Sequence, residues 1–201
     1  MAAIDLKSLV GKLNAPCRRA LEGAAGLTLS RSQFNVEIEH WLVKLLEDER
    51  SDVAACLRHY EIAVERVAAE LARALDRLKT GNAHPPALSP SLVTLGREAW
   101  LLATLEYGDG QIRSGHLLVA LLSDETLGQH ARAASPSLAR IPPDELRRRL
   151  AAITAASAET AETTVRTDSA GPGPVAAGRT ESLDRYTIDL TERARAGRLD
   201  P

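Results

Sequence analysis

The residues able to carry chemistry in this chain are few and widely spaced. It has five histidines and two cysteines in 201 residues. His40 and His116 occupy equivalent places in two similar segments. A structural role in each segment predicts such equivalence, whereas a catalytic or metal-binding role favours a single copy. We therefore interpret both as core or helix-capping histidines.

The remaining candidates for chemistry also lack partners. His59, His84 and His130 have no acidic or cysteine residues at the spacing of a metal site. Cys17 falls just inside a predicted helix, where the dipole can lower a thiol pKa, but a single cysteine is more often a small buried hydrophobe. The sequence thus predicts no catalytic residue, no metal ligand and no cofactor.

Two sequence features that contain charged residues do not predict a ligand-binding site. Gly11-Lys12 lacks the flanking glycine and the Ser or Thr of a phosphate loop. The acidic run 47–49, together with Asp52, is most simply a solvated helix end and turn. Neither feature predicts ligand chemistry.

Charge and composition exclude several classes of function. The formal net charge is −2, so a broad basic face for nucleic acid or an anionic membrane is not expected. The longest apolar runs are shorter than the roughly 18 residues of a membrane span. The N-terminus has no apolar block or cleavage site of a signal peptide, so the predicted compartment is the cytoplasm.

An internal repeat decides the architecture. The ten residues from His40 match the ten from His116 at seven positions. Similar pairs flank this segment, including Pro16 with Pro90 upstream and Leu71 with Leu150 downstream. We therefore predict an all-α domain over residues 1–153, built from two pseudo-symmetric four-helix units at about 14–78 and 89–153.

Helix signals place the elements of each repeat. Pro16 and Pro90 suit the first turn of a helix. Turns are predicted at 26–32 and 108–110, and no strand is predicted because β-branched alternation is missing. The segments after the two histidines are apolar on most of their girth, which predicts a buried centre. The residues expected there are Leu42, Leu45, Leu118 and Leu121.

The composition changes after residue 153. Residues 154–182 are rich in Ala, Thr, Ser, Gly and Pro, so they have too little to bury and are predicted to form a flexible linker. Residues 183–201 regain helical periodicity through Tyr186, Leu190 and Ala194. This pattern indicates the opening of another domain.

The duplicated His-x-Leu-Val-x-Leu-Leu segment, preceded by an Ala-Pro or Ser-Pro helix start, resembles the amino-terminal domain of the Clp/Hsp100 class of AAA+ unfoldases. The stretch 186–201 looks like the segment that opens the first ATPase module in this class. The resemblance implies that the chain itself does not hydrolyse ATP. It also implies that ATP and Mg²⁺ belong to ATPase modules of a longer, hexameric protein, whereas this piece alone is expected to be a monomer.

Within this class, the stretches 13–25 and 38–42 are most similar to the type VI secretion branch, ClpV. An extra amphipathic helix before the first repeat, with apolar residues at Ile4, Leu6, Leu9, Val10 and Leu13, is also typical of this branch. The resemblance implies a recognition module in the cytoplasm of a Gram-negative bacterium. Its expected partner is a helix at the amino terminus of the small subunit (VipB/TssC) of the contracted sheath, which the ATPase ring then disassembles.

A helix laid beside a complete repeat pair creates a groove for an amphipathic partner helix. Leu88 lies in a proline-bounded connector, where a large apolar side chain suggests a contact surface. The predicted partner-binding groove is lined by Leu6, Leu9, Val10, Leu13, Leu88 and Leu92.

Two alternatives remain open from the sequence. In the first alternative, the apolar residues of the extra helix serve only to complete the core, and Leu88 packs under the connector. In the second alternative, the function is substrate or adaptor binding by a general Clp disaggregase or protease-partner unfoldase.

Overall fold

Both repeats begin with a long helix whose first turn contains a proline. The computed structural model describes residues 6–160 of the chain. Asn14 caps α2 (Ala15–Ser30) by accepting a hydrogen bond from a first-turn N–H, and Ser89 caps α6 (Pro90–Leu105) in the same way. Proline fits these first turns because its missing N–H would have had no intrahelical acceptor. The predicted helix starts are confirmed.

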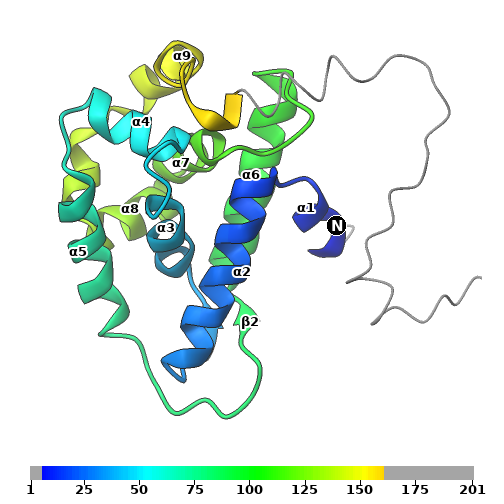
Figure 1. Cartoon of the computed structure of the whole chain (residues 1–201), viewed down its shortest axis with the longest axis vertical. Helices are drawn as coiled ribbons and strands as arrows, with labels where there is room; N and C mark the ends of the chain where they lie inside the picture. Colours follow the sequence, from blue (N-terminus) through cyan, green and yellow to red (C-terminus); the bar gives the residue numbers. More distant parts are fainter. Residues whose placement is uncertain (1–5, 161–201) are drawn as a thin grey trace, which may run out of the picture. The chain divides into compact units, whose positions relative to one another are not determined.

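Each repeat continues with three more helices, shown in Figure 1. In the first repeat these are α3 (Ile38–Leu46), α4 (Asp52–His59) and α5 (Val64–Leu75). In the second they are α7 (Ser114–Ser123), α8 (Glu125–Ala134) and α9 (Pro143–Ile153), with a 3-10 turn η1 (Pro136–Arg140) before the last. The extra helix α1 (Leu6–Gly11) precedes them. The prediction of a helical fold with two four-helix repeats is confirmed.

Short extended segments join the repeats, although the sequence predicts no strand. Strands β1 (Asn35–Val36) and β2 (Ala87–Leu88) pair in parallel. A second parallel bridge joins Leu13 to Ile112. Each connection links the residues before the first helix of one repeat to the residues before the second helix of the other. The repeats are therefore interlocked rather than arranged as two separate bundles.

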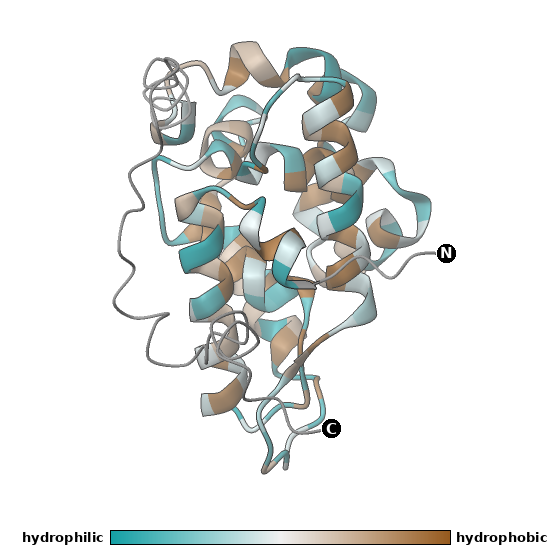
Figure 2. Ribbon diagram, turned by 90° about the vertical axis from the view of Figure 1, so that its right-hand side faces the viewer, coloured by the Kyte–Doolittle hydropathy of each residue, from teal (hydrophilic) through white to brown (hydrophobic). Residues whose placement is uncertain are grey.

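The centre of the domain is formed by the helices that follow the two histidine caps. Every residue of α7 from Ser114 to Leu122 is buried, and α3 is buried on most of its girth. The helices carry both hydrophobic and hydrophilic residues (Figure 2), and the buried hydrophobic residues form a core cluster. The four leucines predicted at this centre are all buried: Leu42, Leu45, Leu118 and Leu121.

The predicted turn at 26–32 is wrong for most of its length, because α2 continues to Ser30. Gly26 lowers helix propensity by about 1 kcal/mol relative to alanine. Packing outweighs this cost, since Thr28 is completely buried and its hydroxyl donates to the Ala24 carbonyl at 2.8 Å. Tertiary burial therefore overrides the glycine signal.

The predicted boundary at residue 153 is also wrong. Residues 154–160 belong to the folded domain, and Thr154, Ser157 and Glu159 are buried. A polar composition indicates a linker only when its side chains find no buried partners, and these three find several. The rest of the predicted linker, 161–182, and the predicted start of an ATPase module, 183–201, lie outside the described residues.

Candidate functional site

Helix α1 packs against α6 at a glycine. A methyl group placed on Gly96 would lie 3.0 Å from Leu9 Cδ2, so the two helices approach as closely as a glycine allows. The Lys12 ammonium lies 4.6 Å from the ring centroid of Trp100, within the range of a cation–π contact. Both contacts fix the extra helix on the second repeat.

The end of α1 is also held by the backbone. The Asn14 N–H donates to the Ile112 carbonyl at 2.9 Å, and the Ile112 N–H donates to the Lys12 carbonyl at 2.7 Å. Leu13 between these bonds is 2% exposed. The extra helix is therefore a docked part of the domain.

The predicted groove residues divide into two groups. Leu9, Leu13 and Leu92 are buried in the core. For Leu9 and Leu13, this burial is what the alternative interpretation of the extra helix expects. Val10 and Leu88 are half-buried and pack on the core while keeping part of their apolar surface accessible. The side chain of Leu6 lies outside the described residues.

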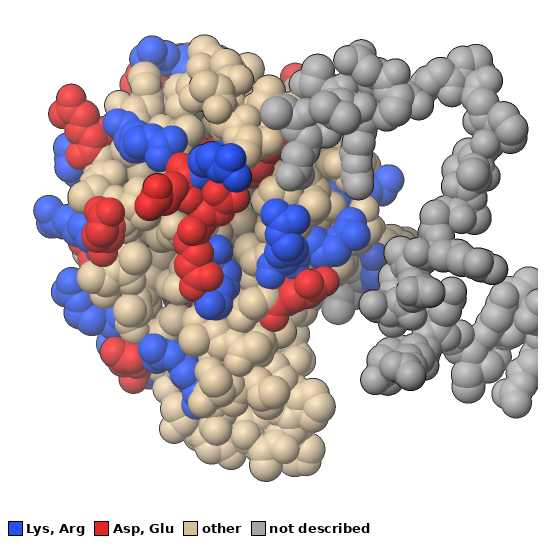
Figure 3. Space-filling view, viewed as in Figure 1, with Lys and Arg blue, Asp and Glu red and all other residues tan. Residues whose placement is uncertain are grey.

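Leu88 lies in the connector that joins the two repeats. It pairs with Val36 in the β1–β2 ladder, and the Ser89 N–H that follows donates to the Val36 carbonyl at 3.1 Å. Figure 3 shows that, on the face in view, the lower end of the domain is formed mainly by residues other than Lys, Arg, Asp and Glu.

Two residues beside α1 were not selected by sequence reasoning. Val93 and Trp100 are half-buried and lie on the same side of α6 as Gly96, since positions three and four apart share a helix face. With Val10 and Leu88 they form a set of half-buried apolar residues on α1, α6 and β2, which we call the α1–α6 surface. The 93–96–100 spacing around a glycine is the sequence signal that could have identified them.

The two histidines cap helices, as predicted. His40 Nδ1 accepts a hydrogen bond from the Glu37 N–H at 3.0 Å, and His116 Nδ1 accepts one from the Arg113 N–H at 3.2 Å. The other nitrogen of His40 donates to Gln33 Oε1 at 2.7 Å. Burial lowers the pKa of His40 to about 4, so its ring is neutral near pH 7.

Cys17 is a packed residue, as interpreted from the sequence. It is fully buried and forms no disulfide, and burial raises the pKa of its thiol well above the usual value. Among residues 6–160, no three His, Cys, Asp or Glu side chains are arranged to hold a metal ion. In the same range no helix is long and apolar enough to cross a membrane.

The buried ion pair of Arg113 and Asp52 corrects one interpretation. Asp52 was expected in a solvated run, but it is 1% exposed, and Arg113 donates to both of its oxygens at 2.8 and 3.0 Å. Glu159 lies beside the pair and accepts from the backbone N–H groups of Asp52 and Ser114 at 2.9 and 2.8 Å. Burial and the neighbouring Asp52 charge raise the pKa of Glu159. This network fastens residues 154–160 to helices α4 and α7.

The extra helix and the two four-helix repeats define an all-α repeat domain. The Clp repeat (R) N-terminal domain family matches residues 12–134, and the chain belongs to this family. It is 32% identical to the AAA+ ATPase ClpV1 of Pseudomonas aeruginosa over its whole length, and 35% identical to a chaperone protein ClpB of Yersinia enterocolitica over 99% of its length. It spans 23% of the length of each relative, and the matched part is the N-domain rather than the ATPase modules.

Solved structures show the same similarity to ClpV. The N-domain of ClpV from Vibrio cholerae is 33% identical, with a TM-score of 0.68 over 79% of this chain and 95% of that chain. A complex of a ClpV N-domain with a VipB peptide is 34% identical, with the same TM-score over 79% and 97%. The resemblance to the ClpV branch, inferred from sequence, is therefore confirmed.

Proposed function

We propose that this domain recognises an amino-terminal helix of a type VI sheath protein, so that an attached ATPase ring can disassemble and recycle the contracted sheath. The observation that carries the proposal is the similarity to a ClpV N-domain whose structure contains a VipB peptide. The proposed setting is the cytoplasm of a Gram-negative bacterium. There the longer protein is a hexamer that uses ATP and Mg²⁺.

The proposed site is the α1–α6 surface. Its half-buried members keep apolar area accessible: Val10, Leu88, Val93 and Trp100. Leu9, Leu13 and Leu92 lie beneath them and hold α1 and α6 in place. An amphipathic helix laid against this surface covers apolar area on both partners, which is the usual mode of helix recognition in a groove.

Calorimetric titration of a synthetic peptide of the sheath protein's amino-terminal helix tests the proposal. We expect Leu88→Glu to weaken binding by more than about tenfold, equivalent to ~1.4 kcal/mol, with little change in melting temperature. Leu105→Glu is the control, because Leu105 is 77% exposed and lies on another face of α6. Unaltered affinity in Leu88→Glu would move the site elsewhere on the domain.

Recognition of unfolded substrates by a general Clp disaggregase is the second candidate, and the 35% identical ClpB relative favours it. A permanently unfolded protein, such as reduced and alkylated α-lactalbumin, separates the two. Binding of this protein without binding of the sheath peptide would replace the first proposal by the second.

A further inference from the structure

A cleft lies between α6 and α7, on a part of the domain that the proposed sheath site does not use. Its volume is about 320 Å³, and we call it the α6–α7 cleft. Leu101, Leu102 and Leu105 of α6 line one side, and Ala120 of α7 lies at the other. Leu101 is 50% exposed and Leu105 is 77% exposed. Two leucines one helical turn apart thus present unburied apolar area to the same cleft.

The rim of this cleft is acidic. Glu98, Glu106 and Asp124 line it, and Arg147 is the one basic side chain among its lining residues. Arg147 forms an ion pair with Glu106, donating through Nε at 2.6 Å. Glu98 and Asp124 therefore leave a negative charge beside the leucines that no lining cation balances.

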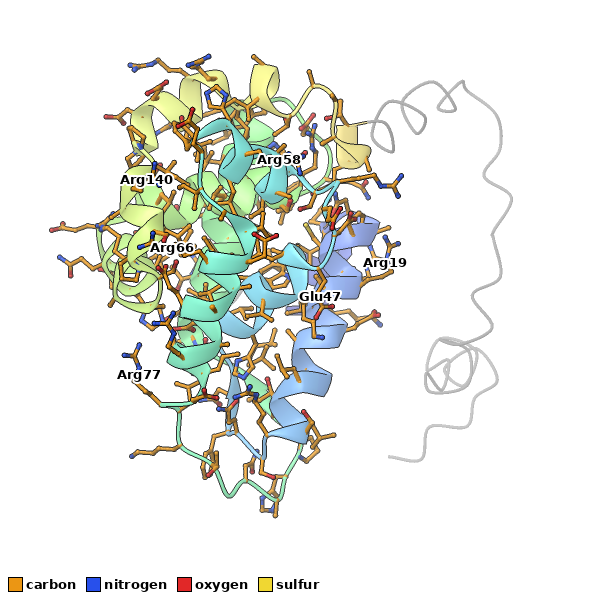
Figure 4. All side chains as sticks on the ribbon, turned by 60° about the vertical axis from the view of Figure 1, so that its left-hand side comes forward. Arg19, Glu47, Arg58, Arg66, Arg77 and Arg140 are labelled. Atoms are coloured by element: carbon orange, nitrogen blue, oxygen red, sulfur yellow. The ribbon has the colours of Figure 1, made fainter. Side chains whose placement is uncertain are left out.

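The corresponding place in the first repeat has different chemistry. The cleft between α2 and α3 has a volume of about 260 Å³, and Lys44 occupies the position of Ala120. The aliphatic stem of Lys44 lies on α2, with its Cδ 3.3 Å from a methyl group placed on Gly23. Figure 4 labels Arg19 on α2 and Glu47 at the end of α3, two charged residues that line this cleft. The exchange of Lys44 for Ala120 leaves the second repeat's cleft without such a cover.

The α6–α7 cleft is also separate from the α1–α6 surface. At 100° per residue, Leu101 and Leu105 lie roughly 140° and 180° around α6 from Gly96, where α1 packs. From Glu98 to Glu106 the cleft follows α6 for roughly 12 Å at 1.5 Å per residue, which matches about two turns of a partner helix. One helix can therefore present both surfaces at once.

We propose that the α6–α7 cleft is a second docking surface, and that its occupant is an amphipathic helix whose apolar stripe is flanked by lysine or arginine. The stripe covers Leu101 and Leu105, and the cationic side chains meet Glu98 and Asp124. This combination of an apolar contact with opposite charge around it gives both affinity and orientation. An acidic or uncharged helix of the same shape lacks the second contribution.

A labelled model peptide of about 14 residues, with leucines at helical spacing and lysines elsewhere, tests the proposal by fluorescence anisotropy with the full chain. We expect saturable binding that weakens as salt is raised, and at least about tenfold weaker binding when glutamate replaces every lysine. The double variant Leu101→Ser/Leu105→Ser should lose about tenfold in affinity for the lysine peptide. Circular dichroism checks that this variant, altered only at exposed positions, remains folded.

Leu88→Glu is the matched control, because it alters the α1–α6 surface and leaves the cleft intact. We expect it to keep its affinity for the lysine peptide, while Leu101→Ser/Leu105→Ser keeps its affinity for the sheath peptide. Equal binding of the lysine and glutamate peptides, or unaltered binding by the double variant, would overturn the proposal. Loss of sheath-peptide binding in the double variant would also overturn it, because the two surfaces would then be one.

Discussion

The central helices of the two repeats carry the same motif at different depths. Helix α7 is buried at every residue from Ser114 to Leu122, whereas α3 leaves Val43 and Lys44 partly exposed. Both helices start with the same histidine cap. The residue before α7 is the buried Arg113, but the equivalent residue before α3 is the half-buried Glu37.

This difference shows that the two copies of a duplicated sequence have different places in the domain. The second repeat places its central helix in the middle of the whole domain, where α4 of the first repeat also reaches it through a hydrogen bond from the Val53 N–H to the Ser114 hydroxyl. The first repeat keeps a more exposed central helix with a charged cleft beside it. Stability is therefore concentrated around α7, and substitutions that compare matched positions should reveal it.

The largest effect is expected from the ion pair at the start of α7. Asp52→Ala leaves the Arg113 guanidinium buried without its carboxylate, which costs about 3–5 kcal/mol of unfolding free energy. Glu47→Ala removes an exposed carboxylate of the first repeat and should cost less than about 1 kcal/mol. Urea denaturation of both variants measures the difference, and equal losses would contradict a special role for the ion pair at the start of α7.

Truncation of the two central helices compares the repeats directly. Leu118→Ala and Leu42→Ala should each lower the free energy of unfolding by about 2–5 kcal/mol. We expect the larger loss at Leu118, because this side chain is completely buried and solvent cannot fill the cavity that its truncation leaves. Thermal melts of the two variants provide the measurement. A smaller loss at Leu118 than at Leu42 would show that depth in the fold does not set the cost.

The histidine cap of the first repeat predicts a pH dependence. Because burial lowers the pKa of His40 to about 4 from an unfolded value near 6.5, the unfolded state binds the proton more readily between these two values. The contribution of His40 is therefore complete above about pH 6.5 and is lost as the pH falls toward 4. It amounts to roughly 3 kcal/mol at 1.36 kcal/mol per pKa unit.

Denaturation curves recorded across this pH range test the prediction. His40→Gln should be less stable at neutral pH but should show a shallower loss of stability on acidification. An identical slope in the variant and the parent chain would assign the pH dependence to other groups, such as the pair of Glu39 and His130.

The smallest effect is expected at Lys44, which marks the difference between the two clefts. Its stem covers Gly23, and its ammonium pairs with Glu47 at 2.7 Å near the surface. Lys44→Ala should cost about 0.2–1 kcal/mol. Lys44→Met keeps the stem and should recover most of this loss in the same denaturation assay. No recovery would assign the loss to the ion pair.

The sequence by itself determined the helical repeat, the helix starts and the central leucines. These features follow from local rules: proline and capping residues fix where a helix begins, and apolar spacing fixes which face is buried. The equivalence of His40 and His116 was sufficient to identify both as structural, because duplication copies a cap and its backbone partner together. The extra helix was also visible as an amphipathic stripe.

Only the tertiary structure decided how these elements fit together. The extension of α2 through Gly26, the burial of Asp52, and the anchoring of residues 154–160 by Glu159 depend on partners that lie far away in the sequence. The division of the predicted groove residues into buried supports and accessible contacts depends on how closely α1 approaches α6 at Gly96. Local composition could not show any of these, because a polar or small residue changes its role once a distant part of the chain supplies a hydrogen bond, an opposite charge or a packing surface.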